Sequence, residues 1–120
     1  MNNTDTLSIT INGKRSTIRI RKSVIKVLRN PEYICLRVHK DFSSIAMLPC
    51  KSTDFLSFKT PDNFITSARA DFRIYSKQFT QSVFDNNNLN LDLSYLFSGR
   101  YLEAQNAVIF DVIKATPLEL

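Results

Sequence analysis

Apolar residues recur at every second position in several short stretches of this chain. In residues 17–21, for example, two isoleucines alternate with threonine and arginine. Successive side chains of a strand point to opposite faces, so this period indicates strands with one buried and one exposed side. The same alternation occurs at residues 7–12, 33–39 and 70–75. Short strands therefore make up much of the expected fold.

Two stretches change to the spacing of a helix. After Lys22 four aliphatic residues fall on one side and basic residues on the other, and Asn30-Pro31 ends the stretch because proline cannot continue a helix. Ser76 can cap a second helix that runs to about Asp85, where three asparagines follow. The pattern thus predicts two short helices.

Further strands are predicted elsewhere, at residues 45–48, 55–59, 89–93, 100–104 and 107–113. A linker is expected at about 60–69, and residues 115–120 are expected to form a tail. The core is expected to contain five phenylalanines: Phe55, Phe58, Phe64, Phe72 and Phe79.

The two halves of the chain can be laid over each other. Ile18-Arg19-Ile20 falls on Phe72-Arg73-Ile74, residues 34–38 fall on 89–93, and Phe42-Ser43 falls on Phe97-Ser98, at offsets near 54. The predicted fold is therefore α+β. It has two pseudo-repeated strand–helix–three-strand units, at about 16–59 and 70–114, with two short helices and eight to nine strands in a single domain, 1–120.

Tandem units of this kind resemble one domain of a DNA sliding clamp. The resemblance is carried by FRIYSKQFTQSVFDNNNLNLDLSYLFSGRYLEAQNAVIFDVI, and more weakly by residues 18–59. In clamps the helices present basic residues to the DNA backbone, which would assign that role to Lys22, Lys26, Arg29 and Lys77. A clamp ring has six such domains, whereas this chain supplies one, so encirclement would require self-assembly.

A second stretch, STIRIRKSVIKVLRNPEYICLRV, is similar to the swapped-hairpin regulators of the AbrB and MraZ type. Those proteins read DNA with arginines on strands and loops, which would assign that role to Arg15, Arg19 and Arg21. The family usually has a glycine-rich turn after the helix, where this chain has Arg29-Asn30-Pro31.

The positive charge is concentrated in the first half. Residues 1–60 carry eleven Lys and Arg against four Asp and Glu, a formal charge of +7, whereas residues 61–120 carry a formal charge of −2. Seven cations lie within sixteen positions that contain no acid: Lys14, Arg15, Arg19, Arg21, Lys22, Lys26 and Arg29. Cations gathered on one surface attract phosphates and displace their counterions, so these residues are the candidate nucleic-acid-binding site. A solvated basic surface is the alternative interpretation.

Residues for catalysis or for metal binding are few. Cys35 and Cys50 do not complete a zinc site with the single His39. A disulfide between them is geometrically possible, but the reducing cytosol argues against it, so they are interpreted as two thiols. The two glycines form no phosphate-binding loop, and His39 has no evident triad partners. No enzyme activity, cofactor or metal is therefore expected. Aspartates and a glutamate of the second half are interpreted as surface charges.

The favoured function is non-catalytic binding of double-stranded DNA through the basic first repeat, mainly by phosphate contacts. The alternative is a protein–protein module, such as an inhibitor or adaptor encoded by a mobile element, that docks on an acidic or nucleic-acid-binding protein surface. Tyr33, Phe42, Tyr75 and Tyr95 could stack on bases, although core packing or cross-strand pairing is their commoner use. The start, MNNTDTLS, lacks the features of a signal peptide, and no apolar run is long enough for a membrane span, so a cytoplasmic protein that could self-associate is expected.

Overall fold

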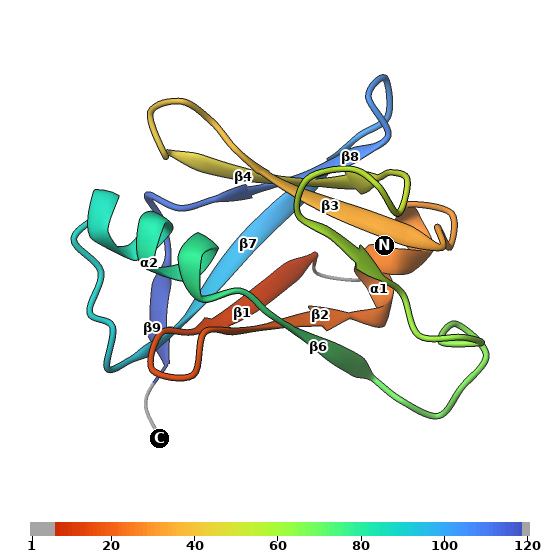
Figure 1. Ribbon diagram of the computed structural model, residues 1–120, viewed down its shortest axis with the longest axis horizontal. Helices are drawn as coiled ribbons and strands as arrows, with labels where there is room; N and C mark the ends of the chain where they lie inside the picture. The colour runs from red at the N-terminus through yellow and green to blue at the C-terminus, as the bar shows by residue number, and fades with distance from the viewer. Residues whose placement is uncertain (1–6, 119–120) are drawn as a thin grey trace, which may run out of the picture.

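The computed structural model describes residues 7–118, which form nine strands and two helices (Figure 1). The strands are β1 (Ser8–Asn12), β2 (Thr17–Arg21), β3 (Tyr33–Val38), β4 (Ser44–Pro49), β5 (Ser57–Lys59), β6 (Asp71–Tyr75), β7 (Ser94–Leu102), β8 (Ala107–Asp111) and β9 (Thr116–Leu118). The helices are α1 (Lys22–Val27) and α2 (Lys77–Asn86). The four alternating stretches of the sequence are confirmed as β1, β2, β3 and β6.

The strands form one antiparallel sheet that is nearly closed. The order is β5–β3–β4–β8–β7–β1–β2–β6, and β9 pairs with β7. In Figure 1, β3, β4 and β8 make an upper layer, β1, β2 and β6 make a lower one, and β7 crosses between them. The long β7 serves both layers because its first half pairs with β1 and its second half with β8. The core therefore lies between the two layers.

The expected α+β fold with two repeated units is wrong. Strand, helix and further strands do follow one another twice along the chain, from β2 and from β6, but the sheet does not divide at the middle of the sequence. Instead β4 pairs with β8, β1 with β7, and β2 with β6, so strands from both halves close one barrel-like sheet. The two short helices add no layer to it.

Alternating side chains fill the interior. Fully buried residues come from both halves of the chain and include Phe64, Phe84, Phe97 and Phe110. At the crossing of β7, Gly99 leaves room for the ring of Phe110, since a Cβ on Gly99 would lie 2.7 Å from that ring. Of the five phenylalanines expected in the core, Phe64, Phe72 and Phe79 are buried and Phe58 is partly buried. Phe55 is 73% exposed, so that expectation was wrong.

Helix α2 begins as the sequence predicts. The Ser76 hydroxyl accepts a hydrogen bond from the backbone N–H of Phe79 at 3.3 Å, which makes Ser76 the N-cap. On the buried side Phe79, Val83 and Phe84 pack against the sheet. Within residues 7–118 neither helix is long and apolar enough to cross a membrane.

The segment after α2 differs from its prediction. Residues 89–93 form turns rather than a strand, and the Asn90 side chain accepts a hydrogen bond from the backbone N–H of Asp92 at 2.9 Å. Asparagine competes with strand formation through such local bonds. At the other end Thr116–Leu118, which were expected to belong to a tail, form β9; residues 119–120 lie outside the described residues.

Cys35 and Cys50 are joined in a disulfide, so their interpretation as two thiols was wrong. Cys35 lies on β3, Cys50 follows β4, and the hairpin between them brings their Cα atoms to 5.9 Å. The disulfide therefore joins the middle of β3 to the segment between β4 and the edge strand β5.

Candidate functional site

The outer side of β2 and β6 carries the most concentrated charge of the lower layer. Ile18 and Ile20 point into the core, so the residues between and beside them point outward. The register places Arg19 directly opposite Arg73 of β6. Six outward residues of these two strands are called the β2–β6 face below: Thr17, Arg19, Arg21, Asp71, Arg73 and Tyr75.

Within residues 7–118 only one of the two central arginines of this face has an acidic partner. Arg19 Nε lies 3.8 Å from Asp71 Oδ2, and both side chains are about one-third exposed. Within residues 7–118 Arg73 makes no ion pair. Like charges directly opposite each other on paired strands destabilise a sheet. An anion bound between Arg19 and Arg73 would remove that repulsion.

Neutral polar groups lie beside these arginines. Arg19 also pairs in register with Thr10 of β1, and Thr17 pairs with Asn12. With Ser94 of β7 these side chains line a shallow hollow of about 400 Å³ that contains Arg19 and Arg73. Hydroxyl and amide groups can donate to phosphate or sugar oxygens, so the hollow offers both charge and neutral donors.

The other predicted cations lie beyond the two ends of β2. Lys14 and Arg15 occupy the β1–β2 turn, whereas Lys26 and Arg29 are exposed on and after α1. Lys22 is partly occupied: Nζ donates to the Ser67 carbonyl at 2.5 Å and lies 5.5 Å from the centre of the Phe64 ring. The seven residues therefore follow the length of β2 instead of forming one compact cluster.

The fold also brings acids to the basic run. Asp71 joins Arg19 and Arg21 around a small hollow next to α1. Asp92 lines another hollow with Lys14 and Arg15. Both aspartates come from the second half of the chain, which explains why the sequence alone showed no acid near these cations. In the middle of β2 Arg19 pairs with Asp71, whereas Arg73 opposite it makes no ion pair within residues 7–118.

Arg73 was not among the predicted site residues, and Tyr75 was named only as one of four aromatic residues that could stack on bases. The Tyr75 side chain is 62% exposed, which differs from the core packing considered for it. Their place could have been read from the alternation, because Phe72 and Ile74 point inward and their neighbours must then point outward. What the sequence could not show is that β6 pairs with β2.

His39 has a partner that the sequence did not suggest. Its Nδ1 lies 2.7 Å from Asp41 Oδ1, and the same oxygen accepts hydrogen bonds from the hydroxyl and backbone N–H of Ser43. The Ser43 bonds, followed by His39, lower the pKa of Asp41 to about 2. The serine hydroxyl donates to the carboxylate and not to the imidazole, so this exposed trio does not activate a nucleophile.

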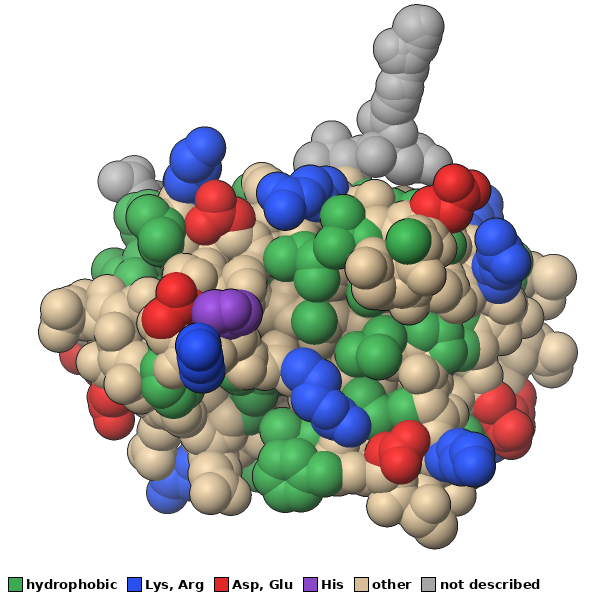
Figure 2. Space-filling model, turned by 90° about the horizontal axis from the view of Figure 1, so that it is seen from above, with side chains coloured by type: hydrophobic (Ala, Val, Ile, Leu, Met, Phe, Trp, Pro, Cys, Tyr) green, Lys and Arg blue, Asp and Glu red, His purple; other side chains and the backbone are tan. Residues whose placement is uncertain are grey.

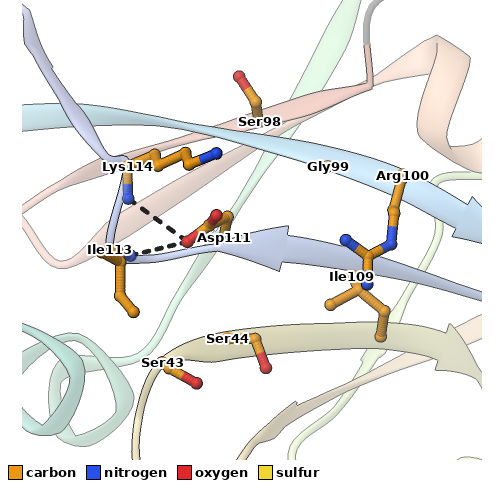
Figure 3. Close-up of a pocket in the computed structure, with 9 residues that line it drawn as sticks. All are labelled: Ser43, Ser44, Ser98, Gly99, Arg100, Ile109, Asp111, Ile113 and Lys114. Carbon is orange, nitrogen blue, oxygen red and sulfur yellow. Dashed lines mark hydrogen bonds between the residues drawn. The ribbon is translucent and has the colours of Figure 1, made fainter.

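On the upper layer a hollow of about 540 Å³ lies beside β7 and β8 (Figure 3). Arg100 and Lys114 contribute charge to it, and Ser98 contributes a hydroxyl. The hollow is also lined by the Asp111 carboxylate, which already accepts hydrogen bonds. Its Oδ1 accepts from the backbone N–H of Ile113 at 2.9 Å and from that of Lys114 at 3.4 Å. Asp111 therefore holds the turn after β8.

The rest of the upper layer carries apolar groups with scattered charges, as Figure 2 shows from above. Among its exposed residues are Phe55 and Ile113, at 73% and 75% exposure. In the part of the chain that the structure describes, acidic residues do not gather into a metal site. Among residues 7–118 the one group with ligand spacing is Cys35, Cys50 and Asp54, whose two sulfurs are joined in the disulfide.

No protein-family model matches the chain, and neither does any curated protein or solved structure. The resemblances to a sliding-clamp domain and to AbrB- and MraZ-type regulators therefore stay predictions.

Proposed function

We propose that this chain binds nucleic acid without catalysis, through phosphate contacts made by the β2–β6 face. The observation that carries the proposal is the pair formed by Arg19 and Arg73, which lie opposite each other. Arg19 pairs with Asp71, whereas Arg73 makes no ion pair within residues 7–118. Guanidinium groups form paired hydrogen bonds with phosphate oxygens, and every phosphate bound releases condensed counterions. Arg21 and the cations beyond each end of β2 extend the positive surface.

Duplex DNA, the ligand expected from the sequence, is the first to test. Binding of a fluorescent random duplex of about 30 base pairs is followed by anisotropy at 50 and 200 mM salt. With about three phosphates neutralised, affinity is expected to fall about 40-fold between these two concentrations. Micromolar binding at the lower salt supports the proposal with duplex DNA as the ligand, and absence of binding there contradicts duplex DNA as the ligand.

The open edge of β6 favours a second candidate, a protein-interaction module. Within residues 7–118 β6 pairs on one side only, with β2. The backbone N–H of Ser76 donates to the Ser16 carbonyl, and that of Lys22 donates to the Ala70 carbonyl. These bonds show that the backbone N–H and C=O groups of the even-numbered residues of β6 point toward β2. The N–H and C=O groups of Asp71, Arg73 and Tyr75 therefore face away and could pair with an added strand. The nearby arginines would favour an added strand with acidic side chains.

Hydrogen exchange separates the two candidates. A synthetic peptide of alternating glutamate and valine, added as a strand to β6, would protect the backbone N–H of Arg73 and Tyr75 from exchange. Nucleic acid bound to the arginine side chains would leave those N–H groups exchanging as in the free protein. Protection by the peptide with no affinity for DNA would favour the protein-interaction module.

The cytoplasmic location expected from the sequence also stays a proposal. The Cys35–Cys50 disulfide argues against it, because disulfides persist mainly in oxidising compartments.

A further inference from the structure

Tyr75 is the one tyrosine of the chain whose ring stands largely in solvent. Tyr95 is 8% exposed and packs against Phe84, and the Tyr101 hydroxyl donates to Asn106 Oδ1 at 2.7 Å. Tyr75, at 62% exposure, takes part in none of the ring contacts found in residues 7–118. A large aromatic ring is thus displayed on the β2–β6 face without a partner.

The surroundings of Tyr75 suggest what its ring could bind. Tyr75 follows Arg73 by two residues on the same side of β6, a separation of about 6.6–6.8 Å along a strand. Arg19 lies opposite Arg73, and Thr17 lies opposite Tyr75. One aromatic surface, two guanidinium groups and a hydroxyl therefore lie within a few residue spacings. This set matches the parts of a nucleotide: a base, a phosphate and a sugar.

We infer that the β2–β6 face takes single-stranded nucleic acid, with one base stacked on Tyr75 and the adjoining phosphates on Arg73 and Arg19. This inference rests on the proposed function and specifies its ligand. In a duplex the bases are paired and stacked on each other, so a side chain on a sheet surface cannot reach their faces. A single strand exposes them, and aromatic stacking combined with backbone cations is how proteins bind such strands without sequence preference.

The shape of the hollow agrees with this ligand. It extends from Arg73 across β2 and β1 to Ser94 of β7 and Leu118 of β9, with the neutral donors of Thr10 and Asn12 along its course. A strand laid from Tyr75 over the two arginines would follow it. The hollow offers few neutral hydrogen-bond donors, and we expect them to contact the backbone of the ligand. One stacked base and phosphate contacts without sequence preference are therefore expected.

The test uses the absence of tryptophan from the chain. Tyr75→Trp introduces a single tryptophan, whose fluorescence is expected to be quenched to saturation by a 15-residue oligothymidine but not by a duplex of the same length. In anisotropy titrations Tyr75→Leu is expected to weaken oligothymidine binding by about 5- to 100-fold, and Tyr75→Phe to leave it nearly unchanged. Duplex binding rests on phosphate contacts, so Tyr75→Leu is expected to weaken it much less than it weakens oligothymidine binding.

Phe55→Leu is the matched control, because Phe55 is also a largely exposed aromatic residue and lies before β5, which pairs with β3 of the upper layer. Its oligothymidine affinity should equal that of the unaltered chain. Equal binding of single strand and duplex, with no effect of Tyr75→Leu, would overturn the inference and leave the proposed function standing. Failure of both ligands to bind at low salt would overturn both.

Discussion

Replacing Phe84 by alanine is expected to lower the free energy of unfolding by about 3–5 kcal/mol. The side chain is fully buried between α2 and the sheet, with its ring 5.5 Å from that of Tyr95 in an edge-to-face arrangement. Gly13 lies against the same ring, since a Cβ there would be 2.6 Å from it. The alanine leaves a cavity between α2 and the β1–β2 turn, and these two elements cannot both move in to fill it. Urea unfolding followed by circular dichroism measures the change.

Phe55→Ala is the control for Phe84→Ala. It removes the same atoms from a side chain that is 73% exposed, so stability should change by less than about 0.5 kcal/mol. Similar losses in the two variants would contradict the packing described for α2, and with it the burial assigned to both phenylalanines.

Reversing the charge of the two central arginines, in Arg19→Glu/Arg73→Glu, is expected to weaken nucleic-acid binding by roughly 100-fold or more at 50 mM salt. Each lost bond between a cation and a phosphate removes about 1.5–3 kcal/mol, and the new carboxylates repel the ligand besides. The slope of log affinity against log salt should also fall, by about 1.8 for two lost phosphates. Anisotropy titration over a salt series measures both quantities.

Lys51→Glu/Arg100→Glu is the matched control. It changes the net charge by the same amount, but both residues are exposed on the side of the upper layer. Affinity should fall only by the small amount that the lower net charge of the protein causes. If both double variants lost affinity equally, binding would reflect overall charge, and the β2–β6 face would have no special role.

The local patterns in the sequence predicted elements well and their assembly badly. Alternation located β2 and β6, because a side buried against a core requires it along five residues. Nothing in such a stretch states which strand lies beside it. The pairing of β4 with β8 joins residues more than sixty positions apart, and it was this pairing that replaced two expected units by one closed sheet.

The wrong strand at residues 89–93 has a different cause. Its leucines alternate as in a strand, and Leu89 and Leu91 do pack against the core. Asn88, however, adopts φ 55°, and the backbone N–H of Asn90 donates to the Tyr95 hydroxyl, so the segment turns instead of extending. Asparagines favour such backbone conformations, and their frequency here was the stronger signal.

About half of the candidate site was visible in the sequence. Arg19 and Arg21 were predicted from charge and alternation, and both lie on the β2–β6 face. Arg73 comes from the half whose net charge is negative, so counting charges along the sequence did not select it. The disulfide was rejected for a different reason, because a reducing cytosol was expected; the register of the β3–β4 hairpin brings Cys35 and Cys50 together.

The interlocked order of the strands has a consequence for how the protein is made. β1 pairs with β7, and β4 pairs with β8. The ribosome adds these two partner strands only when residues 94–111 are synthesised. Until then the edges of β1 and β4 stay open to other chains, including those emerging from adjacent ribosomes on the same message. Folding on the ribosome is therefore expected to wait until most of the chain has left the exit tunnel.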